Sequence, residues 1–142
     1  MTSAKYTLLF MCSLAIFAWI GLAQAQNAKT VKLPSGEEVI DISGEWDDQI
    51  ENYGPWSKYG EYTNILKITI EGNSFVGVRM KSDVWHSSGS VAIRGELDKH
   101  GIKKVQMMSG QGPLDARGQI SENGNKITID DGEKARLTLK RK

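Results

Sequence analysis

From Ile42 to the end of the chain, apolar and polar residues alternate in short segments that are separated by glycine-containing turns. A repeat of two places successive side chains on opposite faces of a β-strand, so each segment would present one apolar face. Eight segments show this pattern: residues 42–47, 64–70, 75–80, 90–97, 102–108, 114–120, 126–130 and 135–139. The pattern predicts an all-β domain over residues 42–142.

The connections between most of these segments are short, which favours an antiparallel up-and-down order. Asp98-Lys99-His100-Gly101 and the Asn123-Gly124 pair are typical hairpin turns. A single sheet with one apolar face must bury that face, and closing into a barrel does so while removing the sheet edges. We therefore expect an eight-stranded antiparallel up-and-down barrel, with a two-sheet β-sandwich as the alternative.

The alternation also assigns side chains to the barrel interior. In the first strand Ile42, Gly44 and Trp46 share the inward face. In the third strand the inward set is Val76, Val78 and Met80. Arg79 is then outward. In the fourth strand the inward set is Val91, Ile93, Gly95 and Leu97, and the last three strands place Leu114, Ile127 and Leu137 on the inward side. In the fifth strand residues 102 and 108 are out of phase with residues 105 and 107, which predicts a β-bulge.

The first 25 residues have the features of a secretory signal peptide. Lys5 precedes an apolar run over residues 8–22, and Ala23-Gln24-Ala25 matches a cleavage site. An uncleaved membrane anchor is the alternative, but the run is shorter than the roughly 20 apolar residues that a span needs. We expect a secreted or periplasmic protein with no stable membrane anchor after cleavage.

Cleavage would leave 142 minus 25, or 117, residues and would remove Cys12, so packing alone would hold the domain. It would also remove Lys5 from the 18 basic residues and none of the 17 acidic ones, giving a formal net charge of zero. That balance does not favour nucleic acid as a partner. Residues 26–41 form a polar lead, in which Pro34-Ser35-Gly36 predicts a small hairpin.

Counting strands divides the connections between the two ends of the barrel. One end receives tight turns at residues 71–74, 98–101 and 121–125, and the other receives the longer segments 48–63, 81–89 and 109–113. Binding residues are often found in long loops on a rigid scaffold. The candidate ligand-binding residues are the aromatic and polar side chains at this end: Asp48, Tyr53, Trp56, Tyr59, Tyr62, Trp85 and His86. The same aromatics would also serve to plug the barrel mouth.

Catalytic and metal-binding patterns are weak, so we assign no catalytic residue, no metal ligand and no cofactor. His86 and His100 are assigned to opposite ends of the barrel. Glu45 and Asp47 point outward if Trp46 points inward, which leaves Asp48 on the inner face. Asp48, together with Asp83 and His86, would orient a ligand gripped by the aromatic side chains.

Gly44-Glu45-Trp46 at the start of an eight-strand meander resembles the G-x-W opening of the calycins, the group that contains the lipocalins and avidins. The resemblance implies a ligand-binding barrel with Trp46 on its floor, where lipocalins place a cation from the last strand across their Trp. Arg136 and Lys140 are the positions considered for that cation, although both are in the outward phase. Counterparts of the second lipocalin motif and of the later avidin tryptophans are missing.

The sequence leads to two functional hypotheses and leaves an enzyme third. The first is a binding module for a small amphipathic molecule at the aromatic mouth. The second is a protein-interaction or inhibitor module that uses the same loops. A cavity of about 300 Å³ or more would support the first hypothesis, and a filled interior would support the second.

Overall fold

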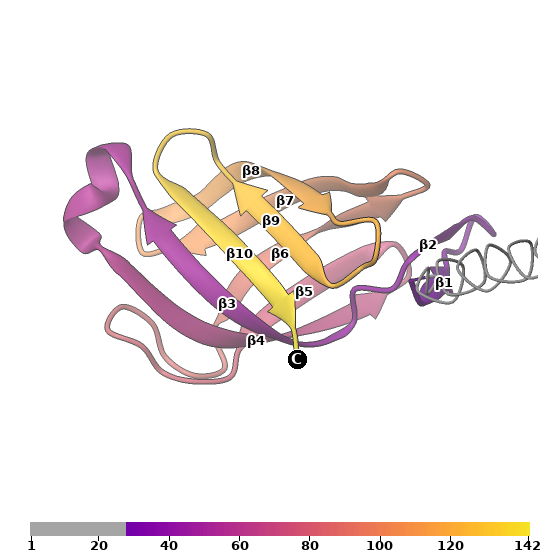
Figure 1. The fold of residues 1–142 in the computed structure, drawn as a ribbon, viewed down its shortest axis with the longest axis horizontal. Helices are drawn as coiled ribbons and strands as arrows, with labels where there is room; N and C mark the ends of the chain where they lie inside the picture. The colour runs from indigo at the N-terminus through magenta and orange to yellow at the C-terminus, as the bar shows by residue number, and fades with distance from the viewer. Residues whose placement is uncertain (1–27) are drawn as a thin grey trace, which may run out of the picture.

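The computed structural model describes residues 28–142, which form a closed eight-stranded antiparallel barrel (Figure 1). The predicted signal peptide, residues 1–25, lies outside the described residues. The barrel strands are β3 (Gly44–Asn52), β4 (Glu61–Glu71), β5 (Ser74–Arg79), β6 (Val91–Asp98), β7 (Gly101–Ser109), β8 (Gly112–Ile120), β9 (Lys126–Asp130) and β10 (Ala135–Arg141). Each strand pairs with the next, and β10 pairs with β3 to close the barrel, so the sandwich alternative is wrong.

The small hairpin predicted before the barrel is present as β1 (Thr30–Lys32) and β2 (Glu38–Ile40), which pair antiparallel. It lies at the end of the barrel that has the tight turns (Figure 1). Leu33 and Val39 are buried in the same core as Ile42. The hairpin therefore adds apolar side chains to that end of the barrel.

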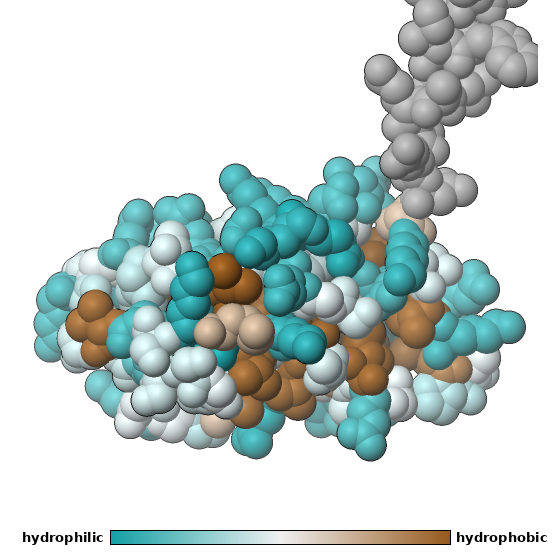
Figure 2. Space-filling model, turned by 90° about the horizontal axis from the view of Figure 1, so that it is seen from below, coloured by the Kyte–Doolittle hydropathy of each residue, from teal (hydrophilic) through white to brown (hydrophobic). Residues whose placement is uncertain are grey.

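Side chains from every barrel strand fill the interior, and the largest that are fully buried include Trp46, Phe75, Leu66 and Leu139. The predicted inward phases of β3, β8, β9 and β10 are confirmed by the alternation of burial along these strands. Figure 2 shows one face of the molecule, where hydrophilic side chains surround smaller groups of apolar ones.

The predicted phase of β5 is wrong. Phe75 and Arg79 are buried, whereas Met80 is 43% exposed. Gly77 shares the inward face with Phe75 and lies against Ile93, leaving no room there for a larger residue. Both faces of β5 carry apolar residues, so alternation alone does not choose between them.

The irregular pairing of β5 with β6 accompanies this change of phase. Gly77 is opposite Ile93, but Val78 is opposite Val91, so Ala92 is an extra residue in the ladder. Ala92 is buried and Val91 is 37% exposed, which corrects the inward assignment of Val91. The bulge predicted in β7 is confirmed. Glu96 on β6 pairs with Lys104 and Leu97 pairs with Ile102, so Lys103 is an extra residue in β7.

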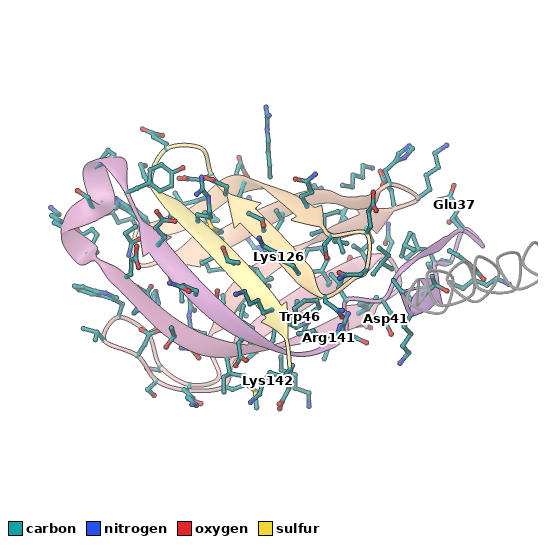
Figure 3. The ribbon with its side chains drawn as sticks, viewed as in Figure 1. Glu37, Asp41, Trp46, Lys126, Arg141 and Lys142 are labelled. Atoms are coloured by element: carbon teal, nitrogen blue, oxygen red, sulfur yellow. The ribbon has the colours of Figure 1, made fainter. Side chains whose placement is uncertain are left out.

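Trp46 lies near the start of β3, at the end of the barrel opposite the long connections (Figure 3). It is fully buried, and its Nε1 donates a hydrogen bond to the Ile42 carbonyl at 3.0 Å. The strand continues to Asn52, as a floor position for Trp46 requires. The cation beside Trp46 belongs to Arg141, so Arg136 and Lys140 were the wrong candidates.

Within the described part of the chain, no helix is long and apolar enough to cross a membrane.

Candidate functional site

Two long connections stand at one end of the barrel, as the count of strands predicted (Figure 1). The first contains the 3₁₀ helix η1 (Gly54–Tyr59) between β3 and β4, and the second is the loop of residues 80–90 between β5 and β6. The short β7–β8 and β9–β10 turns complete this end. We call this end the mouth.

Helix η1 is attached to the β9–β10 turn. The Tyr53 hydroxyl donates a hydrogen bond of 2.6 Å to Asp130 Oδ1, and the Tyr53 amide donates to the Lys134 carbonyl at 2.8 Å. The hydrogen bond to Asp130, aided by burial, raises the pKa of Tyr53 to about 12. Gly54 has a φ of +52°, and its Cα lies so close to the Glu133 carbonyl that a side chain would collide with it. These contacts place η1 over the mouth.

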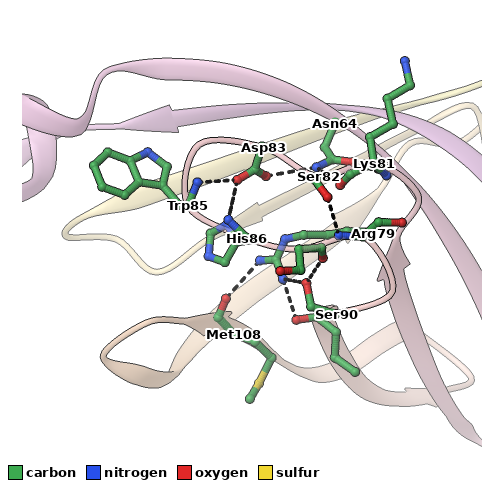
Figure 4. A network of polar contacts seen from close by, with 12 residues as sticks. Asn64, Arg79, Lys81, Ser82, Asp83, Trp85, His86, Ser90 and Met108 are labelled. Atoms are coloured by element: carbon green, nitrogen blue, oxygen red, sulfur yellow. Dashed lines mark hydrogen bonds and ion pairs between the residues drawn. The ribbon is translucent and has the colours of Figure 1, made fainter.

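A network of hydrogen bonds orders the β5–β6 loop (Figure 4). Asn64 Nδ2 on β4 donates to Asp83 Oδ2 at 2.9 Å and to the Lys81 carbonyl at 3.0 Å. Asp83 Oδ1 accepts the amides of Trp85 and His86, each at 2.8 Å. Asp83 therefore fixes the backbone that carries both predicted site residues of this loop.

Hydrogen bonding also sets the charge of Asp83. Burial raises its pKa, but hydrogen bonds from Trp85, Asn64 and His86 outweigh burial and hold the pKa below its ordinary value. The His86 ring lies 3.2 Å from Asp83 Oδ1. Burial and the nearby Arg79 charge nevertheless lower the pKa of His86. At neutral pH, Asp83 is therefore ionised and His86 is uncharged.

Arg79 reaches into the barrel interior beneath this loop and is 8% exposed. Its Nη1 donates to the Val91 carbonyl at 2.7 Å and to Ser90 Oγ at 3.1 Å, and its Nη2 donates to the Met108 carbonyl at 3.1 Å (Figure 4). These acceptors, all from β6, β7 and the adjoining loop, allow a guanidinium to be buried. The sequence pattern did not indicate Arg79, because the predicted alternation of the third strand placed Arg79 on the outward face.

The mouth contains a pocket of about 200 Å³. Its walls are the aromatic side chains of Trp56 and Tyr59 from η1, Tyr62 from β4 and Trp85 from the β5–β6 loop. His86 and the β7–β8 turn also line the pocket. Tyr59 packs edge to face between Trp56 and Trp85, with ring centroids 6.1 Å and 5.2 Å apart and interplanar angles of 81° and 77°. The rings therefore form a concave wall that does not fill the mouth.

A second cavity of about 60 Å³ lies inside the barrel under the pocket. Trp56, Tyr62 and His86 line both spaces, so the cavity continues the pocket inward. Asp48 and Arg79 also line the cavity, among apolar residues such as Met107 and Leu137. The mouth is thus neither fully plugged nor a deep open cup.

Asp48 is the most unusual group in this region. It is 4% exposed, and its Oδ1 has no hydrogen-bond partner among residues 28–142. Burial raises the pKa of Asp48 to about 7, with the Arg79 charge opposing the rise and the Asp83 charge adding to it. An unpaired buried carboxyl is costly for a fold, which indicates a role other than stability.

The structure brings six of the seven predicted site residues to the pocket or to the cavity beneath it: Asp48, Trp56, Tyr59, Tyr62, Trp85 and His86. Tyr53 lies outside both linings and attaches η1 to the barrel. Asn52 and residues 109–111 also line the pocket, although the sequence analysis did not select them. Asn52 and Ser109 end β3 and β7, and residues 110–111 form the β7–β8 turn, so their position at the mouth is the signal that would have indicated them.

Two larger hollows, of about 490 and 560 Å³, lie elsewhere on the barrel. Charged side chains such as Arg94, Lys104 and Asp115 line the first, and Asp115, Arg117 and Asp130 line the second. Neither combines an aromatic wall with a buried polar group. We therefore consider the mouth the better candidate despite its smaller volume.

Within residues 28–142 there is no group of three or more His, Cys, Asp or Glu side chains that could hold a metal ion. No family model, curated protein or solved structure matches the chain. The site is therefore interpreted from its own geometry.

Proposed function

We propose that this protein is a non-enzymatic binding module that holds a small amphipathic molecule at the barrel mouth. The observation that carries the proposal is the pairing of an aromatic pocket with a buried carboxyl group beneath it. Trp56, Tyr59 and Trp85 supply apolar contact area, and Asp48 supplies a polar group at the inner end. Sites for small molecules commonly combine a mostly apolar wall with a few placed polar groups.

The order of the surrounding loops supports this proposal. Asp83 holds the backbone of Trp85 and His86, and the Tyr53–Asp130 hydrogen bond holds η1, the helix that carries Trp56. A site whose side chains are held before binding loses less conformational entropy when the ligand arrives.

The volume of the pocket limits the ligand. At about 200 Å³ it is below the roughly 300 Å³ that is typical for drug-sized molecules. The interior below it is largely filled by Trp46, Leu66, Phe75 and their neighbours. We therefore propose a ligand with one small ring and a short polar substituent.

The test is to titrate the purified protein with indole, 2-phenylethanol and phenethylamine while following tryptophan fluorescence, and to measure affinities by calorimetry. At least one of these probes should bind. Trp56→Ala and Trp85→Ala should each weaken binding at least tenfold, because each removes part of the wall. Val84→Ala is the matched control and should bind like the wild type, since Val84 lies next to Trp85 in the same loop, is exposed and lies outside the pocket lining.

The unfolding temperature of each variant completes the experiment. If Trp56→Ala or Trp85→Ala unfolds the domain, these side chains plug the barrel and the proposal fails. The absence of any response to the three probes would also count against it.

A second candidate function is a protein-interaction or inhibitor module. The observation in its favour is the exposure of apolar side chains on the β5–β6 loop, where Val84 is 83% exposed, Trp85 52% and Met80 43%. Val84 lies outside the pocket lining, so Val84→Asp separates the two functions. This variant should lose a protein partner and keep the small-molecule probes.

We also propose that residues 1–25 direct export and that the barrel is calycin-like. The closed eight-stranded order and the G-x-W opening with Trp46 beside Arg141 support the second statement. For the first, N-terminal sequencing of the protein from an extracytoplasmic fraction should find Gln26 as the first residue.

A further inference from the structure

Above the pKa of Asp48, which is about 7, the groups in and around the cavity under the mouth carry more acidic than basic charge. Asp48 and Arg79 line the cavity, and Asp83 lies against His86 beside it. Asp48 and Asp83 are the acidic groups, Arg79 is the cation, and His86 is uncharged because burial and Arg79 lower its pKa. With both carboxylates ionised, the net charge of this group is minus one. A ligand that carries one positive charge would neutralise it.

The hydrogen bonds of these groups decide which one is available to a ligand. Asp83 already accepts hydrogen bonds from Asn64, Trp85 and His86. The Arg79 guanidinium donates to three acceptors, which are Ser90 Oγ and two backbone carbonyls. Asp48 Oδ1 is the buried side-chain atom that lacks a partner within residues 28–142, and Asp48 lines the cavity.

The aromatic wall also suits a cation. Organic ammonium groups are attracted to the faces of Trp and Tyr rings, and two or three rings set at right angles are a common arrangement for them. Lys134 Nζ already lies 5.5 Å from the Trp56 ring centroid, and Lys58 Nζ lies 5.2 Å from that of Tyr59. Both lysines belong to the rim, where solvent screens their charge from the cavity.

We infer that the ligand carries a single protonated amine, which passes the aromatic wall and forms a charged hydrogen bond with Asp48 Oδ1. This inference rests on the proposed function and names the chemical class of the ligand. The cavity of about 60 Å³ admits a group of a few non-hydrogen atoms, such as an aminomethyl group, while the attached ring stays in the pocket. The amine supplies the donor that the buried carboxyl lacks, so binding offsets the cost of burying it.

The experiment compares three probes of similar shape and different charge: phenethylamine, 2-phenylethanol and 3-phenylpropionate. The wild-type protein near pH 8 should bind the amine at least about tenfold more tightly than the alcohol, and the carboxylate most weakly. Asp48→Asn keeps the size of the side chain and removes its charge, so it should bind the amine and the alcohol equally. Asp47→Asn is the matched control, because Asp47 is the exposed neighbour on the outer face of β3.

The pH dependence of amine binding gives a second readout that does not depend on any variant. The groups that face Asp48 are Arg79 from β5, Tyr62 from β4, and Asp83 and His86 from the β5–β6 loop. Asp48 must be ionised to pair with an ammonium group. The affinity for phenethylamine should therefore rise by up to about tenfold per unit as the pH increases from about 5.5 toward 7, and then level off.

Three outcomes would overturn the inference: equal affinity of the wild type for amine and alcohol, a preference for the amine that survives in Asp48→Asn, or no binding of phenethylamine at low millimolar concentration. Failure of the proposed function is separate. If indole or 2-phenylethanol binds and Trp56→Ala removes that binding, the mouth is still a ligand site and only the class of ligand is wrong.

Discussion

The guanidinium of Arg141, the last residue of β10, stacks on the indole ring of Trp46 with its carbon 4.3 Å from the ring centroid. Arg141 also donates hydrogen bonds to the carbonyls of Asp41 at 2.6 Å, Ser43 at 3.1 Å and Gly124 at 3.1 Å. Asp41 and Ser43 precede the barrel, Trp46 lies in its first strand, and Gly124 lies in the β8–β9 turn. Figure 3 shows Asp41, Trp46 and Arg141 at the same end of the barrel. One side chain thus ties together the lead, the first strand and a distant turn.

We predict that Arg141→Ala lowers the free energy of unfolding by about 2–4 kcal/mol, because it removes the cation–π contact and leaves three carbonyls without their donor. Arg141→Lys should recover part of that loss, since an ammonium group keeps the charge but lacks the planar fork. Urea denaturation measures both. Lys140→Ala, one residue earlier and exposed, is the control and should stay within about 0.5 kcal/mol of the wild type. A similar loss in both variants would contradict the role of Arg141.

Asp48 should make the stability of the free protein depend on pH. Its pKa is about 7 in the folded state against 3.8 for an ordinary Asp, so the folded protein holds this proton more tightly than the unfolded chain. The resulting stabilisation is present at low pH and is lost as the pH rises toward 7, by about 1.4 kcal/mol per pH unit and on the order of 4 kcal/mol in all.

Asp48→Asn cannot ionise, so we predict that it is more stable than the wild type at pH 8 and that its advantage shrinks toward pH 4. Thermal or urea unfolding across this range tests the prediction. Asp47→Asn on the outer face should follow the wild-type profile. An advantage of Asp48→Asn that did not change with pH would show that Asp48 is not the titrating group.

Gly95 on β6 should tolerate no side chain. A Cβ at this position would collide with the Lys104 carbonyl on β7 and would lie 2.6 Å from the Phe75 ring. Because the carbonyl belongs to the strand ladder and cannot move aside, we predict that Gly95→Ala costs about 3 kcal/mol or more. Gly110→Ala is the control, since nothing lies within 4 Å of a Cβ there, and its stability should change by less than about 0.5 kcal/mol. Equal stability of the two variants would mean that β6 and β7 can separate locally.

Much of the fold could be predicted from local patterns. The alternation in β8, β9 and β10 placed Leu114, Ile127 and Leu137 on the inward side, and the glycine turns marked where strands end. Counting strands then placed Trp56 and Trp85 at the same end of the barrel. These inferences succeeded because the direction of a strand side chain depends mainly on the residues beside it in sequence.

Prediction failed where both faces of a strand fit the same pattern. On β5 the set Val76, Val78 and Met80 is more apolar than the observed inward set of Phe75, Gly77 and Arg79, because the observed set includes a charged residue. Burial of Arg79 depends on carbonyls of Val91 and Met108, which come from other strands. No local pattern reveals such acceptors.

The sequence by itself therefore determined that the chain is a β protein, where its strands and turns fall, and which end carries the aromatic residues. The tertiary structure decided the phase of β5, the choice of Arg141 over Arg136 and Lys140 as the partner of Trp46, and the isolation of Asp48 beneath the mouth. The physical reason is the range of the forces involved. Alternation and turn formation act between neighbours in sequence, whereas the hydrogen bonding and desolvation of a buried charge depend on groups that meet only when the barrel closes.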